Sequence, residues 1–135
     1  TAAQNVLAMT HAGLPGSPWH DRAKKLAPKG TGAVLAFELA GGVEAGKAFV
    51  NALTLHSHVA NIGDVRSLVI HPASTTHQQL SAEEQLATGV TPGLVRLAVG
   101  IEGIDDILAD LERGFAAAKS VSEAEASDPR AVAAF

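Results

Sequence analysis

One arginine in this sequence needs an anionic partner. Arg96 stands in the middle of a short apolar run, rich in Val and Leu, that extends from Gly93 to Gly100. A run of this length and composition indicates a strand that is covered on both faces. Burying a guanidinium without a partner costs roughly several kcal/mol, so Arg96 must meet an anion. That anion is either an Asp or Glu of the protein or the carboxylate of a ligand, whose two oxygens match the planar fork of the arginine.

Asn61 is the second candidate for binding. It lies near the end of an apolar strand predicted over residues 58–62, and a buried amide there needs hydrogen-bond partners. Those partners are either the local backbone, in a turn closed with Gly63, or a ligand. Together Asn61 and Arg96 would form a clamp for a carboxylate, although their spacing in the sequence does not establish that they meet.

The six histidines raise the question of a metal site. His56 and His58 would point to the same side of a strand, and His71 and His77 bracket a loop rich in Ser and Thr, within residues 71–79. No His-Glu-x-x-His motif and no suitably spaced third ligand is present, so we expect surface or loop histidines with ordinary hydrogen bonds. The loop has neighbouring Ser and His but no acid partner or oxyanion turn. This favours a turn whose Ser and Thr side chains hydrogen-bond to its own backbone over a Ser–His nucleophile.

Composition limits the classes of function. The chain has 135 residues, of which 47% are apolar and 18% charged, and this suits one globular domain with its own core. The net charge of −4 is spread along the chain, and without a basic patch we expect no nucleic-acid partner. No apolar run is long enough to span a bilayer, so we expect no membrane partner. Cysteine is absent, which excludes disulfides and thiolate metal sites and suits a cytoplasmic protein.

Hydrophobic periodicity and turn residues predict the elements that must position Arg96 and Asn61. The predicted strands cover residues 33–39, 58–62, 67–70 and 93–100, and the apolar residues 6–9 form a helix end or a short strand. The predicted helices cover residues 19–26 and 43–53, a short segment after Ser81, and a longer segment from Ile104 onward. Ser81-Ala82-Glu83-Glu84 is a capping box, in which a hydroxyl and a carboxylate each serve a free backbone amide.

These elements favour an α+β fold. The connections between the middle strands are short, which is typical of a small, mainly antiparallel sheet with helices packed on one face. The last segment, residues 120–135, is rich in Ala, Ser and Glu and is broken by Pro129. We expect it to form a peripheral tail.

Several short motifs occur in an order that resembles one enzyme family. They are Ser17-Pro18-Trp19, residues 29–37, Asn61-Ile62-Gly63-Asp64, residues 67–77 with their Thr-Thr-His ending, and residues 93–102. They resemble the C-terminal domain of the pyridoxal-phosphate (PLP) enzymes of cysteine and methionine metabolism, which are of fold type I, and most of all the O-acetylhomoserine sulfhydrylase branch. The resemblance covers roughly residues 5–119. It implies a substrate-carboxylate-binding domain over residues 1–119.

The resemblance also implies an activity, a γ-replacement in methionine biosynthesis that makes homocysteine from O-acetylhomoserine and sulfide, with PLP as cofactor. It assigns the α-carboxylate of the substrate to Arg96 and Asn61, which match the family's positions, and no catalytic, cofactor-binding or metal-binding residue to this chain. The Schiff-base lysine is expected in an N-terminal domain of the same polypeptide, because no lysine here lies in a motif like the family's Ser-x-Thr-Lys.

By the same resemblance, the whole enzyme is a homo-tetramer with a small amino-acid substrate, and this chain alone is inactive. The sequence begins at Thr1 rather than at a methionine, and we expect a part of a longer enzyme. Two alternatives stay open. One is another branch of the family, cystathionine γ-synthase or γ-lyase. The other is a stand-alone binding or interaction module that reuses the fold without the cofactor.

Overall fold

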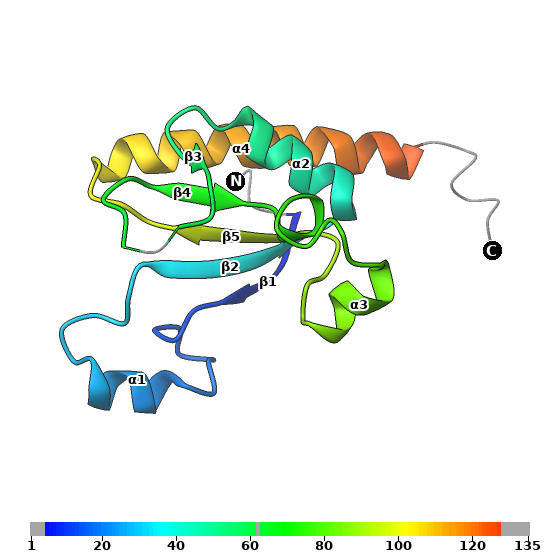
Figure 1. The fold of residues 1–135 in the computed structure, drawn as a ribbon. Helices are drawn as coiled ribbons and strands as arrows, with labels where there is room; N and C mark the ends of the chain where they lie inside the picture. The colour runs from blue at the N-terminus through cyan, green and yellow to red at the C-terminus, as the bar shows by residue number, and fades with distance from the viewer. Residues whose placement is uncertain (1–4, 62, 128–135) are drawn as a thin grey trace.

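The computed structural model describes residues 5–61 and 63–127, in which helices and strands are interspersed (Figure 1). The strands are β1 (Val6–Thr10), β2 (Val34–Leu39), β3 (Ser57–His58), β4 (Leu68–Ile70) and β5 (Leu94–Ala98). The helices are α1 (His20–Leu26), α2 (Gly42–Ala52), α3 (Ala82–Ala87) and α4 (Ile104–Ser127), with a short 3₁₀ helix, η2, at Pro72–Ser74. Of the two interpretations of residues 6–9, the strand is correct.

The five strands form one sheet in the order β1-β2-β5-β4-β3. Every neighbouring pair is antiparallel except β3 and β4, which run parallel. The predicted α+β fold with a mainly antiparallel sheet is therefore confirmed. β5 carries Arg96 and lies at the centre of the sheet, where hydrogen bonds to β2 and β4 fix its backbone on both sides.

The strand predicted over residues 58–62 is wrong in its extent. Only the two residues of β3 pair with β4, and the amide of Val59 donates to the carbonyl of Ser57 (3.0 Å) instead of extending the ladder. The chain turns out of the sheet there. Val59, one of the apolar residues that suggested a longer strand, lines the same hollow as Leu68 but is 42% exposed. Ile62 lies outside the described residues.

Helices α2 and α4 pack together on one face of the sheet, as Figure 1 shows, and bury the core beneath them. The rings of Phe37 in β2, Phe49 in α2 and Phe115 in α4 meet with centroids 5.0 to 5.5 Å apart. Such clusters combine a large buried area with favourable tilted and edge-to-face geometry. The two helices approach closely at Gly114, where a Cβ would lie 2.8 Å from the Phe49 ring.

The opposite face of the sheet, which we call the open face, has no such cover. Helices α1 and α3 lie away from the α2–α4 layer and bury none of their residues (Figure 1). The capping box predicted for α3 is confirmed. The Ser81 hydroxyl accepts a hydrogen bond from the Glu84 amide (3.3 Å), and the Glu84 carboxylate accepts one from the Ser81 amide (2.8 Å).

The helix predicted from Ile104 continues to Ser127, so residues 120–127 are its last turns. The hydroxyl of Ser122 donates to the carbonyl of Ala40 (2.7 Å) and ties this end of α4 to the end of β2. The rest of the expected tail, residues 128–135, lies outside the described residues. Among the helices that the structure describes, none combines the length and apolar character needed to cross a membrane.

Candidate substrate-carboxylate site

Arg96 lies in the middle of β5, and the alternation of side chains along this strand decides where it points. Val95 and Leu97 are buried under the helices, with 0% and 2% of their surface exposed, whereas Arg96 is half-buried on the open face. The expectation that this strand is covered on both faces is therefore wrong for the described chain. The register places Arg96 beside Ala36 of β2 and Ile70 of β4, so that only a methyl group flanks it on the β2 side.

Arg96 and Asn61, the two residues singled out by the sequence, meet on the open face. They line one small hollow, whose other lining residues are Val59, Leu68, Val69, Ile70 and Ala98. Nη2 of Arg96 donates a hydrogen bond to the main-chain carbonyl of Asn61, 3.3 Å away. The contact therefore uses the backbone of Asn61 rather than its amide side chain. A guanidinium has five N–H donors, and this hydrogen bond uses one of them.

The internal ion pair that would explain Arg96 without a ligand is missing from the described residues. Within residues 5–61 and 63–127, no Asp or Glu lies within ion-pair distance of Arg96. Of the two anions considered from the sequence, the internal one is not found among the described residues, and the carboxylate of a ligand stays a prediction. The other side chains around the hollow are mostly apolar, and low local polarity strengthens the attraction between a guanidinium and an arriving anion.

A polar cluster follows Asn61 and was missed by our sequence reasoning. The carboxylate of Asp64 accepts hydrogen bonds from the amide (2.9 Å), Nε (3.2 Å) and Nη2 (2.9 Å) of Arg66. The side-chain hydrogen bond from Arg66 is the main reason that the pKa of Asp64 lies far below its usual range, and the Arg66 amide and the Asn61 side chain lower it further. Asp64 is therefore ionised at neutral pH. The signal in the sequence is an Asp after Gly63 with Arg66 two positions later, as in an Asx turn.

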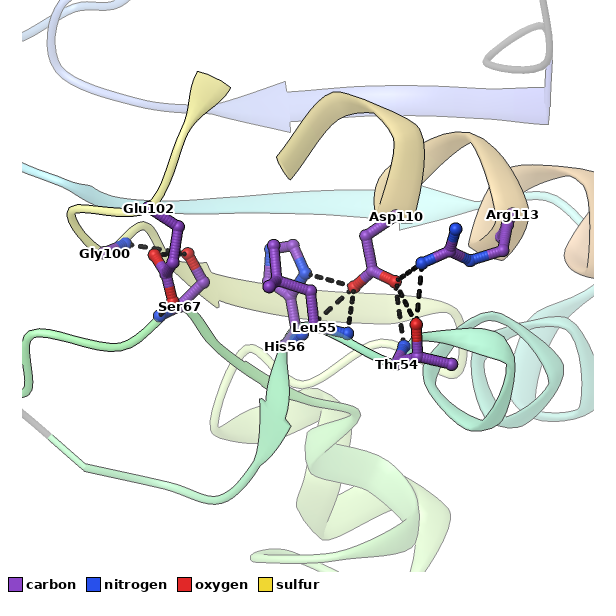
Figure 2. A network of polar contacts seen from close by, with 8 residues as sticks. All are labelled: Thr54, Leu55, His56, Ser67, Gly100, Glu102, Asp110 and Arg113. Atoms are coloured by element: carbon purple, nitrogen blue, oxygen red, sulfur yellow. Dashed lines mark hydrogen bonds and ion pairs between the residues drawn. The ribbon is translucent and has the colours of Figure 1, made fainter. Parts of the chain in front are cut away.

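A buried carboxylate fixes the segment that leads into β3 (Figure 2). Asp110 of α4 accepts hydrogen bonds from the amides of Thr54 (2.8 Å), Leu55 (3.1 Å) and His56 (3.0 Å), and from His56 Nδ1 (2.7 Å). Arg113 forms an ion pair with the same carboxylate. Burial acts to raise the pKa of Asp110, but these hydrogen bonds, the one from the His56 ring foremost, hold that pKa well below its usual range.

A second carboxylate joins β4 to the loop that follows β5 (Figure 2). Glu102 accepts hydrogen bonds from the amide (2.7 Å) and the hydroxyl (2.8 Å) of Ser67, and the Gly100 amide donates to the same hydroxyl (2.9 Å). A Cβ on Gly100 would lie 2.4 Å from the Ser67 amide nitrogen, so the close approach requires glycine. The hydrogen bond from the Ser67 amide is the largest cause that lowers the pKa of Glu102. Both carboxylates thus hold the strands on which the hollow is built.

Known proteins that resemble this chain decide its family. The family model described as Cys/Met metabolism PLP-dependent enzyme matches residues 1–116. Over 114 residues, the chain is 56% identical to O-acetyl-L-homoserine sulfhydrylase of Corynebacterium glutamicum, which covers 84% of this chain and 26% of that relative. The chain belongs to the Cys/Met metabolism family of PLP-dependent enzymes. The resemblance seen in the sequence motifs is confirmed.

Other members of the family are also close. L-methionine gamma-lyase of Fusobacterium nucleatum subsp. polymorphum is 50% identical over 104 residues, which is 77% of this chain and 26% of that protein. Cystathionine gamma synthase from Xanthomonas oryzae pv. oryzae, solved in complex with cystathionine, superposes with a TM-score of 0.74 at 40% identity, over 87% of this chain and 30% of that one. The chain thus spans about a quarter of the length of the curated relatives that it matches.

The residues that line the hollow at Arg96 do not fit the site that bonds PLP, because that site needs a lysine. No lysine lines the hollow at Arg96. Two of the described lysines form ion pairs on helix surfaces, Lys47 with Glu44 and Lys119 with Glu123. Among the described residues, the hollow is therefore lined by a cation, Arg96, and by no lysine that could bond PLP.

Two histidines lie deeper than expected. His56 and His71 are 5% and 0% exposed, so neither is a surface histidine. Both lie in connecting segments outside the helices and strands and make ordinary hydrogen bonds, as the expectation of loop histidines allowed. Nε2 of His71 donates to the carbonyl of Pro92 (2.7 Å), which can only accept, and Nδ1 accepts from the Ser74 hydroxyl (2.8 Å). Burial lowers the pKa of His71, and its Nε2 is held by a carbonyl rather than by a carboxylate. The ring is also fully buried, so this pair lacks both the acid partner and the exposure that a Ser–His nucleophile needs. Within the described residues, no group of three His, Asp or Glu is placed to hold a metal ion.

Proposed function

We propose that this chain is the substrate-carboxylate-binding domain of a PLP-dependent sulfhydrylase that makes homocysteine from O-acetylhomoserine and sulfide. Within this proposal Arg96 binds the α-carboxylate of O-acetylhomoserine, and Asn61 holds the guanidinium in place through its carbonyl. PLP supplies the electron sink for the reaction, and the chain described here binds the amino-acid substrate. Binding the non-reacting carboxylate restricts the substrate to one orientation, which lowers the entropic cost of the chemical step.

The observation that carries this proposal is the position of Arg96. It is a half-buried cation on a central strand, it lies on the face that α2 and α4 do not cover, and no described carboxylate neutralises it. A structural arginine would be expected to have an internal anion. A site for a ligand carboxylate requires an arginine that is held but not neutralised, and Arg96 meets that requirement.

The sulfhydrylase reaction is preferred to other reactions of the family because of the relative in Corynebacterium glutamicum. It is 56% identical to this chain, compared with 50% for the L-methionine gamma-lyase and 40% for the cystathionine gamma synthase. The Asn-Ile-Gly-Asp segment at residues 61–64 and the Thr-Thr-His ending at residues 75–77 support the same branch. Because all these enzymes use amino-acid substrates with an α-carboxylate, the role of Arg96 does not depend on the branch.

The proposal includes the partners of the domain. The rest of the polypeptide supplies the PLP site, including the Schiff-base lysine, and covers the open face of the sheet. The whole enzyme is a homo-tetramer, as the family resemblance of the sequence implies, and it is cytoplasmic, which the absence of cysteine suits. The domain then has no activity of its own, because it holds the substrate carboxylate and not the cofactor.

The test is an arginine substitution in the whole enzyme. We expect Arg96→Ala to lower kcat/KM for O-acetylhomoserine by about 100-fold, because a charge-assisted pair that is lost in a partly buried site costs about 2–4 kcal/mol. Arg96→Lys keeps the charge but loses the fork, so it should recover only a part of that loss. Both are measured by steady-state kinetics with O-acetylhomoserine and sulfide varied in turn.

The matched control is Arg22→Ala, which removes an exposed arginine of α1 and should leave the kinetics unchanged. An Arg96→Ala enzyme that keeps the full kcat/KM for O-acetylhomoserine would contradict the assigned role. The branch is tested with the unsubstituted enzyme. Turnover of O-acetylhomoserine with sulfide should exceed both its turnover with cysteine and the breakdown of methionine, and a reverse order would assign the chain to another branch.

A further inference from the structure

We infer that Asp64 is a positioning residue for the substrate carboxylate, because it holds the turn from which the Asn61 carbonyl orients the guanidinium of Arg96. The inference rests on the proposed function, in which Arg96 binds that carboxylate. It adds a residue that does not line the hollow and that acts only through Asn61. We call the hydrogen-bonded set of Asn61, Asp64 and Arg66 the Asp64 clamp.

Within the Asp64 clamp, the carboxylate of Asp64 is mostly buried. The side chain of Asp64 is 14% exposed, whereas that of Arg66 is 60% exposed and lies on the outside. Both carboxylate oxygens are used, Oδ1 by the Arg66 amide and Nε, and Oδ2 by Arg66 Nη2. The side chain of Asn61 also hydrogen-bonds to Asp64. One carboxylate therefore ties the residue that contacts Arg96 to the residue that leads into β4.

Two described features lie on either side of Asp64 in this turn. Gly63 adopts a φ of +79°, which favours glycine and gives the local backbone little steric restriction. On the far side, the carbonyl of Val65 accepts a hydrogen bond from the amide of Ile101 (3.0 Å) and so is held by the loop after β5. The clamp lies between that restraint and the contact with Arg96, so it is placed to fix the position of the Asn61 carbonyl.

The consequence for binding follows from geometry. The hydrogen bond from Arg96 Nη2 to the Asn61 carbonyl is already long, at 3.3 Å, so a small shift of the turn breaks it. The guanidinium then has one fewer restraint on its rotation, and its fork spends less time aligned with a carboxylate. A misplacement of about 1 Å in a positioning group is enough to cost a large factor in catalysis. The loss should appear in substrate binding rather than in the chemical step.

The experiment uses the whole enzyme and measures KM and kcat for both substrates. We expect Asp64→Ala to raise KM for O-acetylhomoserine about 10-fold and to leave kcat and KM for sulfide unchanged. Asp64→Asn keeps an acceptor for the Arg66 amide but loses the charge, so KM should rise by a smaller factor, about 3-fold. Asp21→Ala, which removes an exposed carboxylate of α1, is the matched control and should change none of these constants.

A double variant separates positioning from simple destabilisation. If Asp64 acts through Arg96, the Asp64→Ala/Arg96→Ala enzyme should have the same KM for O-acetylhomoserine as Arg96→Ala alone. A further 10-fold rise in the double variant would show independent action and overturn the inference, as would an unchanged KM in both single Asp64 variants. A change in kcat rather than in KM would also overturn it. An Arg96→Ala enzyme with unchanged kinetics would instead contradict the proposed function.

Discussion

The two faces of the central sheet place adjacent residues of one strand in different environments. On the face under α2 and α4, Phe37 and Leu97 are 3% and 2% exposed and belong to the core. On the open face, their neighbours Ala36 and Arg96 are half-buried and line up across the β2–β5 ladder. The covered face is filled with side chains from β2, β4, β5, α2 and α4, whereas on the open face a small side chain stands beside a long charged one.

The polar groups of the two faces differ in the same way. Asp110, beneath the covered face, has its acceptors filled by backbone amides and by the side chains of His56 and Arg113. Arg96 has one hydrogen bond to a carbonyl and no ion pair among the described residues. A group whose partners are all internal stabilises the fold, and a group held at one point leaves donors for a ligand. The rigid covered face therefore supports a binding residue on the other side of the same strand.

The largest effect on stability should come from the covered face. We expect Asp110→Ala to lower the free energy of unfolding by about 3–5 kcal/mol, because it leaves three backbone amides and the ring of His56 without their buried acceptor. Urea unfolding of the 135-residue chain measures this. Glu112→Ala, an exposed carboxylate of the same helix, is the control and should change stability by less than about 0.5 kcal/mol. If Asp110→Ala lowered the free energy of unfolding as little as the control does, the contrast between the two faces of the sheet would be contradicted.

The pH dependence of unfolding gives a second measurement of the same carboxylate. The pKa of Asp110 is lower in the folded chain than its ordinary value of 3.8, so the folded state holds the ionised form more strongly. Its contribution is complete above that ordinary value and is lost as the pH falls toward the folded-state pKa. Stability should therefore drop steeply below about pH 4 in the unsubstituted chain, and less steeply in Asp110→Asn. Equal slopes in the two chains would contradict this.

Features that depend on neighbours in the sequence were predictable. The capping box at Ser81 and the strand around Arg96 each come from residues within a few positions of one another, and both are present. The strand expected over residues 58–62 failed because an apolar pattern is the same whether side chains lie within a sheet or pack against one. Nothing local in Val59 shows that the chain leaves the sheet there.

Features that depend on distant partners could not be predicted. Asp110 binds amides 54 to 56 positions away, and in the sequence it was one of several acidic residues on an amphipathic helix. The exposure of Arg96 was misjudged for a related reason. The apolar composition of a strand does not show where the segment that covers its second face comes from. That composition is the same whether the segment belongs to the given sequence or to another part of a larger protein. Arg96 and Asn61 were both chosen as polar residues in apolar surroundings and they do meet, but the burial expected for Asn61 is wrong, because its side chain is exposed and Arg96 is only half-buried.

A pair of adjacent substitutions in β5 should sharpen the contrast between the faces. We expect Leu97→Ala to lower the free energy of unfolding by about 2–4 kcal/mol, because it opens a cavity under the helices. Arg96→Ala should lower it by less than about 1 kcal/mol, since it removes one partly exposed hydrogen bond to a carbonyl. Thermal and urea unfolding of the two variants of this chain provide the comparison. Similar losses would mean that Arg96 contributes to folding and not mainly to binding.

The smallest effect on stability should come from α3, because none of its residues is buried. We expect Ser81→Ala to cost about 1 kcal/mol, because it removes the hydroxyl that caps the Glu84 amide. Glu83→Ala, in the same turn but outside the capping box, should cost only a few tenths of a kcal/mol. Hydrogen exchange should show faster exchange in α3 and unchanged exchange in β5. Faster exchange in β5 would mean that α3 stabilises the core, through Gln85, whose side chain donates to the carbonyls of Ala73 and His77.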